Sequence, residues 1–262
     1  MLAEQRGKTG RWLELLRSPP RPRGRLVMFH YAGGSASVFR PWAELLRPDV
    51  LVQAMQLPGR EGRSKEPLTH CLVEIVNGLA GEIEARDGLP TVFYGHSIGG
   101  LLAFEVAHAL RTTGLEGPDH LIVTGRRAPH LPPPQVVLHR LPDDAFIDAL
   151  ARYDGTPEAV ISDPELMRFF LPRLRADFAI SENYSYLPRG LLACPITAFA
   201  GDSDMEADLE SVFQWRYQSS ASFRFRRMRG GHFFINSERQ AVVDAIGQAL
   251  DSLIDEKGVV AS

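Results

Sequence analysis

The pentapeptide Gly95-His96-Ser97-Ile98-Gly99 restricts the fold of this chain more than any other feature of the sequence. It follows a short apolar run at residues 91–94, typical of a buried strand, and precedes a helix-like segment at residues 101–110. Gly-x-Ser-x-Gly in that setting is typical of a nucleophile elbow, a sharp turn that lifts a serine hydroxyl out of the sheet. Cβ atoms on the two glycines would collide with the adjoining strand and helix. We therefore predict a catalytic role for Ser97; the alternative is a glycine-rich turn that only leads into a helix.

A serine hydroxyl is a poor nucleophile at neutral pH, so a base must accept its proton. In folds with this elbow the acid and then the histidine follow the serine along the chain. Of the eight histidines, only His232 lies between a late strand-like run, residues 223–228, and a terminal helical segment. Two glycines precede it and leave the loop free to place an imidazole, so we predict that His232 is the base. We expect four other histidines to be ordinary solvent-exposed residues: His70, His108, His120 and His139.

The acid is expected on the loop after the preceding strand, which we place at residues 196–200. That loop contains Asp202 and Asp204, and either carboxylate could reach the imidazole. Asp204 fits the Gly-x-x-Asp spacing of such turns, so we favour it as the group that fixes the imidazole tautomer and stabilises the imidazolium. The other aspartate would then cap the turn by binding nearby backbone amides.

An oxyanion hole needs two backbone N–H groups. One is expected from Ile98, the residue after the serine, and the other from the loop at residues 30–35, which follows a strand-like run at residues 25–29. We assign the second donor to the amide of Ala32. The alternative is that the glycines of this loop only make a turn.

Short apolar runs alternate with amphipathic segments along most of the chain. Strands are expected at residues 26–29, 51–56, 91–94, 121–124, 196–200 and 223–228. Helices are expected at residues 41–46, 72–85, 101–110, 208–217 and 238–254. This alternation predicts an α/β fold in which a mostly parallel sheet is covered by helices on both faces.

Two stretches depart from the alternation. Residues 1–24 are basic and rich in proline; residues 12–16 could pack as a short helical turn, and disorder of the first ten or so residues is the alternative. Residues 126–194 contain no convincing strand. We therefore divide the chain into a lead-in at 1–24, a core at 25–125 and 195–262, and a helical lid at 126–194. The lid is expected over the carboxyl ends of the strands, where ligands bind in open α/β sheets.

The lid is expected to contain helices at residues 143–153 and 164–184, capped by Asp143 and Asp163. The second helix carries an apolar stripe, which consists of Met167, Phe169, Phe170, Leu171, Leu174 and Phe178. We expect most of the stripe to pack on the core and a minority to line an acyl pocket.

Composition excludes several classes of function. The 262-residue chain has a net charge of −3, which does not suggest a nucleic-acid surface. Cys71 and Cys194 lie in apolar or strand-like runs and are expected to be buried thiols, and no His/Cys spacing suggests zinc. The N-terminus has no long apolar segment, so neither a secretion signal nor a membrane span is expected. The cytoplasm is the simplest location.

Several motifs together resemble type II thioesterases, the free-standing editing hydrolases of polyketide and nonribosomal peptide synthesis. The matching stretches occur in order through nearly the whole chain, at residues 30–36, 57–63, 95–100, 125–129 and 230–234. The resemblance implies the α/β-hydrolase fold and hydrolysis of stalled or mis-primed acyl groups from the phosphopantetheine thiol of acyl- or peptidyl-carrier proteins, with no cofactor. A full hydrolase sheet would have another strand before residue 25, which the sequence does not reveal.

Four arginines on expected loops could rim the site: Arg60, Arg63, Arg126 and Arg127. One of them could contact the pantetheine phosphate or an acidic carrier protein. The alternative is that they are ordinary surface or ion-paired arginines, for example with Glu61.

Other functions share parts of this pattern. A serine esterase or lipase acting on small esters would have the same catalytic residues. Acyltransferases also carry Gly-His-Ser-x-Gly, but the late aspartate-then-histidine order fits a hydrolase better. A product-releasing thioesterase would be fused to a synthase, whereas this chain begins at Met1 and has no carrier domain. A non-catalytic hydrolase-fold binding protein would not need the intact set of Ser97, His232 and an acid.

Overall fold

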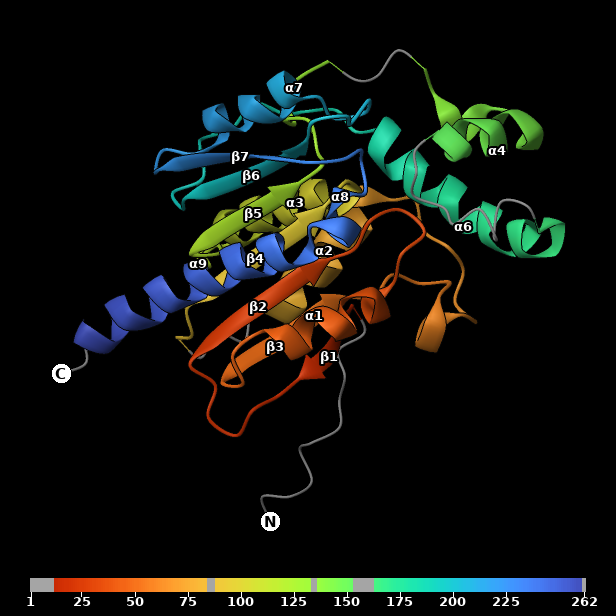
Figure 1. The fold of residues 1–262 in the computed structure, drawn as a ribbon. Coiled ribbons are helices and arrows are strands. Elements are labelled where there is room, and N and C mark those ends of the chain that lie inside the picture. The colour runs from red at the N-terminus through yellow and green to blue at the C-terminus, as the bar shows by residue number, and fades with distance from the viewer. Residues whose placement is uncertain (1–11, 84–87, 133–135, 153–162, 261–262) are drawn as a thin grey trace.

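A computed structural model describes residues 12–83, 88–132, 136–152 and 163–260 of the chain (Figure 1). The first eleven residues of the expected lead-in lie outside the described residues. The same holds for the ends of the helices predicted at 72–85 and 143–153.

The described residues form one seven-stranded sheet with the strand order β1-β3-β2-β4-β5-β6-β7. The strands are β1 Leu13–Arg17, β2 Gly24–Phe29, β3 Val50–Met55, β4 Thr91–His96, β5 His120–Thr124, β6 Ile196–Gly201 and β7 Phe223–Met228. Strand β1 is antiparallel to β3, and every other neighbouring pair is parallel. The prediction of an α/β fold with a mostly parallel sheet is confirmed.

Helices cover both faces of the sheet (Figure 1). The longer ones are α1 Arg40–Leu45, α2 Leu72–Ile83, α3 Ile98–Thr112, α4 Asp143–Arg152, α6 Pro164–Glu182 and α9 Arg239–Val260. The short ones are α7 Leu209–Phe213, α8 Phe234–Ser237 and the 3-10 turns Ala36–Phe39, Glu61–Arg63, Leu138–Arg140 and Gln214–Gln218. Within the described ranges, no helix is long and apolar enough to cross a membrane.

The two faces of the sheet contribute to two separate cores because successive side chains of a strand point to opposite faces. In β2, Val27 and Phe29 belong to the core that also contains residues of α2 and α3. Leu26 and Met28 belong to the other core, with residues of α1 and α9. All six residues of β2 are buried, as expected for a central parallel strand.

The helical turn expected at residues 12–16 is wrong, because strand β1 occupies this segment. These residues extend along the edge of the sheet and pair with β3. The carboxylate of Glu82 in α2 accepts hydrogen bonds from the amides of Trp12 and Leu13, at 2.7 and 2.9 Å, and both side chains are buried. The partners of this strand are distant in sequence, and the five-residue run has no clear period of its own, so local pattern did not reveal it.

The helices between β5 and β6 lie together at one end of the sheet (Figure 1). Met167, Leu171 and Leu174 of α6 are buried in a separate cluster with Phe146 of α4, so most of the predicted apolar stripe packs inside this helical unit and not on the sheet. Phe169, also predicted in the stripe, is 64% exposed. The division into core and lid stays a prediction.

The two predicted helix caps have different outcomes. Asp163 caps α6, because its carboxylate accepts hydrogen bonds from the amides of Glu165 and Leu166. Asp143 is instead the first residue of α4. The carbonyl of Pro142 accepts the first hydrogen bond of that helix, from the amide of Phe146.

Two predictions of exposure are wrong in part. Cys71 is exposed, whereas Cys194 is buried as predicted, and burial raises the pKa of its thiol to about 12. Of the four histidines expected in solvent, His70 is exposed. His108 is instead buried in α3, with its ring 4.5 Å from that of Phe104; His120 is half-buried, and half-buried His139 contacts the carboxylate of Glu182.

Candidate active site

Ser97 lies between the end of β4 and the start of α3, in a backbone conformation with φ of 56° and ψ of −123° that side-chain-bearing residues rarely adopt. The turn is tight on both sides. A Cβ atom on Gly95 would lie 2.3 Å from the carbonyl oxygen of Gly99, and one on Gly99 would lie 2.0 Å from the carbonyl oxygen of Phe29. The expected collisions with helix and strand are therefore present, and the geometry is that of a nucleophile elbow.

Three side chains that are distant in sequence meet at this turn. The Nε2 atom of His232 lies 3.0 Å from the Oγ atom of Ser97, and its Nδ1 atom lies 2.9 Å from Oδ2 of Asp204. Because an ionised carboxylate only accepts hydrogen bonds, Nδ1 carries the proton and Nε2 is left to accept the serine proton. This is the arrangement that a general base needs.

The two candidate acids have different partners. The carboxylate of Asp204 is buried, and its Oδ1 atom accepts hydrogen bonds from the amides of Glu206 and Ala207 at 2.9 and 3.0 Å, which fixes its position. Asp202 is exposed, and its Oδ1 atom accepts a hydrogen bond from the amide of Gly230 at 3.0 Å, which lowers the pKa of that carboxyl. Asp204 thus contacts the imidazole, and Asp202 holds the turn before His232.

The loops after β6 and β7 bring the acid and the histidine together. A Cβ atom on Gly201 would lie 2.5 Å from the carbonyl oxygens of Gly230 and Gly231, so the two loops approach as closely as backbone allows. This contact brings the carboxylate of Asp204 within hydrogen-bond distance of the imidazole of His232.

Both expected oxyanion donors lie at the same cavity as Ser97 and His232. Ile98 is the first residue of α3, where the amide has no partner within the helix. Ala32 lies in a turn closed by a 3.0 Å hydrogen bond from the amide of Gly34 to the carbonyl of Tyr31, in which Gly33 has φ of 76°. The glycines of this loop therefore make the turn that was the alternative to an oxyanion hole. Ala32 nevertheless also lines the cavity, so the two roles are compatible.

His96 is a buried neighbour of the catalytic candidates that sequence reasoning did not single out. Its ring lies 5.1 Å from that of His232, and its Nδ1 atom lies 3.0 Å from the hydroxyl of Thr124. Burial lowers the pKa of His96 well below its ordinary value, so the ring stays neutral and does not repel a positive charge on His232. Its place inside the pentapeptide, beside Ser97, was the available signal.

A cavity of about 670 Å³ opens over Ser97. The helical unit contributes apolar side chains to its wall, among them Leu150, Leu174 and Phe178, the last two from the predicted stripe. Polar and aromatic groups line other parts: Arg126, Arg127, Ser181, Tyr184 and Tyr186. Such a space can hold an acyl group beside the serine while a polar chain leaves through the rim.

The four candidate arginines divide into two pairs. Arg60 and Arg63 are buried and ion-paired, so the alternative of ion-paired arginines holds for them and contact with a carrier or phosphate does not. Their ion-pair partners are Asp177, which is buried, and Glu66, which is partly exposed, and not Glu61. A buried guanidinium needs such a carboxylate within contact distance.

Arg126 and Arg127 line the cavity. Arg126 donates a 2.6 Å hydrogen bond to the hydroxyl of Ser181, and burial lowers the pKa of its guanidinium to about 10.

Comparisons with known proteins agree with this geometry. A family model described as "Thioesterase domain" matches residues 24–250. The chain is 39% identical to the gramicidin S biosynthesis protein GrsT of Aneurinibacillus migulanus, over 89% of this chain and 91% of that protein. It is also similar to the structure of RedJ, a thioesterase from the prodiginine biosynthetic pathway of Streptomyces coelicolor, with a TM-score of 0.83, 37% identity and coverage of 89% and 92% of the two chains. The structure of YbtT, a type II thioesterase from the yersiniabactin NRPS/PKS biosynthetic pathway, matches with a TM-score of 0.82, 31% identity and coverage of 93% and 99%.

Proposed function

The chain belongs to the thioesterase family of serine-based hydrolases, and from this premise we propose that it is a free-standing type II thioesterase with an editing role. Its substrates are stalled or mis-primed acyl groups on the phosphopantetheine thiol of acyl- or peptidyl-carrier proteins. The observation that carries the proposal is the hydrogen-bonded series Asp204–His232–Ser97 at the cavity. Matches over nearly the whole length of GrsT and YbtT support the free-standing form.

The reaction begins when Oγ of Ser97 attacks the thioester carbonyl and its proton passes to Nε2 of His232, 3.0 Å away. Asp204 keeps Nδ1 protonated and stabilises the imidazolium that forms. The amides of Ala32 and Ile98 donate hydrogen bonds to the oxyanion, and losing one such donor typically costs about 3 kcal/mol of barrier.

The C–S bond then breaks, and the pantetheine thiolate takes up the proton from the imidazolium and leaves as a thiol. Thiols are good leaving groups, so this acid step demands less than the release of an amine. A water molecule next attacks the acyl-serine while His232 takes its proton. When the ester bond breaks, the imidazolium returns this proton to Oγ of Ser97, which releases the acid and restores the free serine and the neutral histidine.

The cavity supports an acyl-carrier substrate. Its wall has apolar side chains from the helical unit, which fit an acyl chain, and polar groups elsewhere, which fit the amide-rich pantetheine arm. About 670 Å³ is enough for a short acyl group and part of that arm.

The proposal is tested with carrier proteins loaded separately with acetyl, propionyl, longer acyl and aminoacyl groups, with unloading followed by intact mass. We expect the wild-type protein to unload at least one series and Ser97→Ala to unload none while still binding the carrier. Undiminished unloading by Ser97→Ala would exclude this serine as the nucleophile. Rapid hydrolysis of small soluble esters without any unloading would instead favour a general serine esterase.

A further inference from the structure

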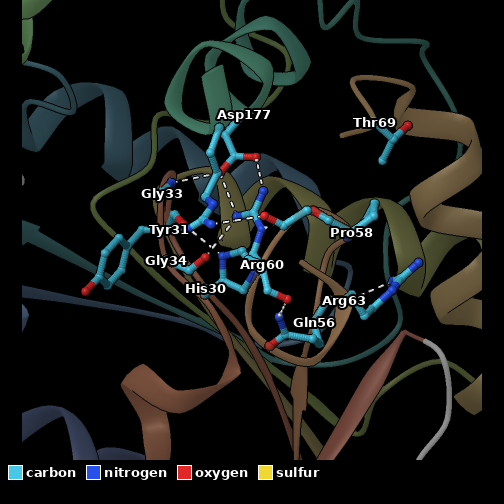
Figure 2. A network of polar contacts seen from close by, with 12 residues as sticks. His30, Tyr31, Gly33, Gly34, Gln56, Pro58, Arg60, Arg63, Thr69 and Asp177 are labelled. Carbon is cyan, nitrogen blue, oxygen red and sulfur yellow. Dashed lines mark hydrogen bonds and ion pairs between the residues drawn. The ribbon is translucent and has the colours of Figure 1, made fainter. Parts of the chain in front are cut away.

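A buried ion pair joins Asp177 of helix α6 to Arg60, which lies after β3 and beside the loop that contains Ala32 (Figure 2). Nη2 of Arg60 lies 2.8 Å from Oδ1 of Asp177, and Nη1 lies 2.9 Å from Oδ2. Both side chains are 1% exposed. The two parallel hydrogen bonds make the bidentate geometry that holds a carboxylate in one orientation.

The same two side chains also hold the backbone next to Ala32. Oδ2 of Asp177 accepts a 2.7 Å hydrogen bond from the amide of Gly33, and Nη1 of Arg60 donates a 2.8 Å hydrogen bond to the carbonyl of Gly34. Figure 2 shows Asp177 reaching from its helix to this glycine pair, with Arg60 between them. The ion pair therefore restrains one N–H and one C=O group directly after the proposed oxyanion donor.

Packing leaves this loop little freedom to move alone. Gly33 has φ of 76°, and a Cβ atom on it would lie 2.6 Å from Cδ2 of Leu174, one turn of α6 before Asp177. On the other side, Oε1 of Gln56 accepts a hydrogen bond from the amide of Ala36, and its Nε2 donates to the carbonyl of Arg60. The orientation of the Ala32 peptide is thus coupled to the position of α6.

A buried ion pair is not needed for stability as such, since well-packed apolar residues of similar volume often serve equally well. The extra hydrogen bonds to the loop identify a different role. We propose that Asp177 and Arg60 are positioning residues for hydrolysis, which hold the Ala32 amide toward the oxyanion when α6 is docked. This inference rests on the proposed function, because it takes Ala32 as an oxyanion donor.

The test uses the full chain and a small soluble thioester, so it does not depend on carrier proteins as substrates. Three variants are compared with wild type: Asp177→Asn, which removes the charge, the double variant Asp177→Leu/Arg60→Met, which replaces the pair by apolar groups, and Ser97→Ala, which sets the inactive baseline. The double variant keeps the experiment informative if the single change leaves Arg60 buried without its partner and the protein does not fold.

The readouts are kcat, KM and the affinities of two acyl analogues. A trifluoromethyl ketone analogue forms an oxyanion on Ser97, whereas a thioether analogue of the same shape cannot react. We expect kcat of the double variant to fall by roughly 10- to 100-fold, less than the complete loss of one oxyanion donor would cause, with KM changed less than threefold. The ketone should lose affinity in parallel, and the thioether should bind as to wild type.

Glu66→Gln is the matched control. It weakens the ion pair with Arg63 in the same region of the chain, whereas the hydrogen bonds to Gly33 and Gly34 come from Asp177 and Arg60. We expect its kcat to stay near that of wild type.

The positioning role is overturned if a folded double variant keeps wild-type kcat and ketone affinity. It is equally overturned if both analogues lose the same affinity, since that result means only a deformed cavity. A wild-type protein that hydrolyses the soluble thioester but never unloads carriers would contradict the proposed substrate alone.

Discussion

The carboxylate of Asp204 lies 2.9 Å from Nδ1 of His232, whereas Asp202, two residues earlier, binds the amide of Gly230 instead. Both aspartates lie on the loop after β6, so the hydrogen-bond partner and not the position in the chain separates their roles. Two backbone amides donate hydrogen bonds to Oδ1 of Asp204, which leaves Oδ2 to accept the hydrogen bond from the imidazole.

Replacing Asp204 by asparagine is expected to reduce kcat for thioester hydrolysis by roughly 10³- to 10⁴-fold, because the amide no longer fixes the productive imidazole tautomer. Asp202→Asn, the matched control, should reduce kcat by less than tenfold. Steady-state hydrolysis, followed with a thiol reagent, measures both. A larger loss in Asp202→Asn than in Asp204→Asn would reverse the assignment of the acid.

Gly99→Ala is expected to prevent stable folding or to displace the elbow, because the added carbon would lie 2.0 Å from the carbonyl oxygen of Phe29. Overpacking of this kind typically costs roughly 1–3 kcal/mol or more. Soluble yield and chemical denaturation measure the effect. A variant with the stability and activity of wild type would show that the strand and helix can separate at little cost.

Gly247→Ala is the control for that substitution. Gly247 lies in α9, and apart from its chain neighbours and the backbone of its own helix, no atom of the described residues lies within 4 Å of an added Cβ. Alanine there should raise the free energy of unfolding by roughly 0.5–1 kcal/mol, because glycine loses more backbone freedom on helix formation.

The stability of the protein should fall between pH 6.5 and pH 4 in part through His30. This side chain is fully buried, and burial lowers its pKa from 6.5 to about 4. Between these values the unfolded chain binds a proton at His30 that the folded chain does not, so stability is complete above pH 6.5 and is lost as pH falls toward 4.

His30→Asn should therefore reduce the loss of unfolding free energy between pH 7 and pH 5 by about 2 kcal/mol. Urea unfolding at the two pH values measures the difference. His70→Asn, at an exposed position, should keep the wild-type difference. If His30→Asn also keeps it, the imidazole of His30 is protonated in the folded chain near its ordinary pKa.

Arg127 is a cavity-lining arginine that remains a candidate for contact with an acidic carrier protein. Arg127→Glu is expected to raise KM for carrier-bound substrate by roughly three- to tenfold, while KM for a small soluble thioester stays the same, since rim charges act mainly on the approach of a charged partner. Arg21→Glu makes the same change at an exposed position outside the cavity wall. Equal effects of Arg127→Glu on both substrates would remove the docking role.

Much of the fold was predictable because its signals are local. In β2 to β6 each strand contains an apolar run and is followed by a turn or loop, and the two glycines beside Ser97 indicate the steric requirements of the elbow. Parallel strands buried on both faces need side chains of this kind whatever their neighbours are. The order serine, aspartate and then histidine likewise follows from which strand precedes each loop.

Other features depend on partners that are distant along the chain. Strand β1 is defined by β3 and by the carboxylate of Glu82, and the choice of Asp204 over Asp202 depends on where the loop of His232 returns. The burial of Arg60 could not be predicted from its own segment, because its partner Asp177 lies far along the chain, in α6.

The amino-acid sequence by itself therefore determined the type of sheet, the elbow and the candidates for nucleophile and base, since short-range sterics and hydrophobic periodicity dictate them. Only the tertiary structure decided which carboxylate contacts His232, and that Arg60 is joined to Asp177 beside the loop of Ala32. Hydrogen bonds and ion pairs act over about 3 Å, and the residues that make them come within that distance only when the chain has folded.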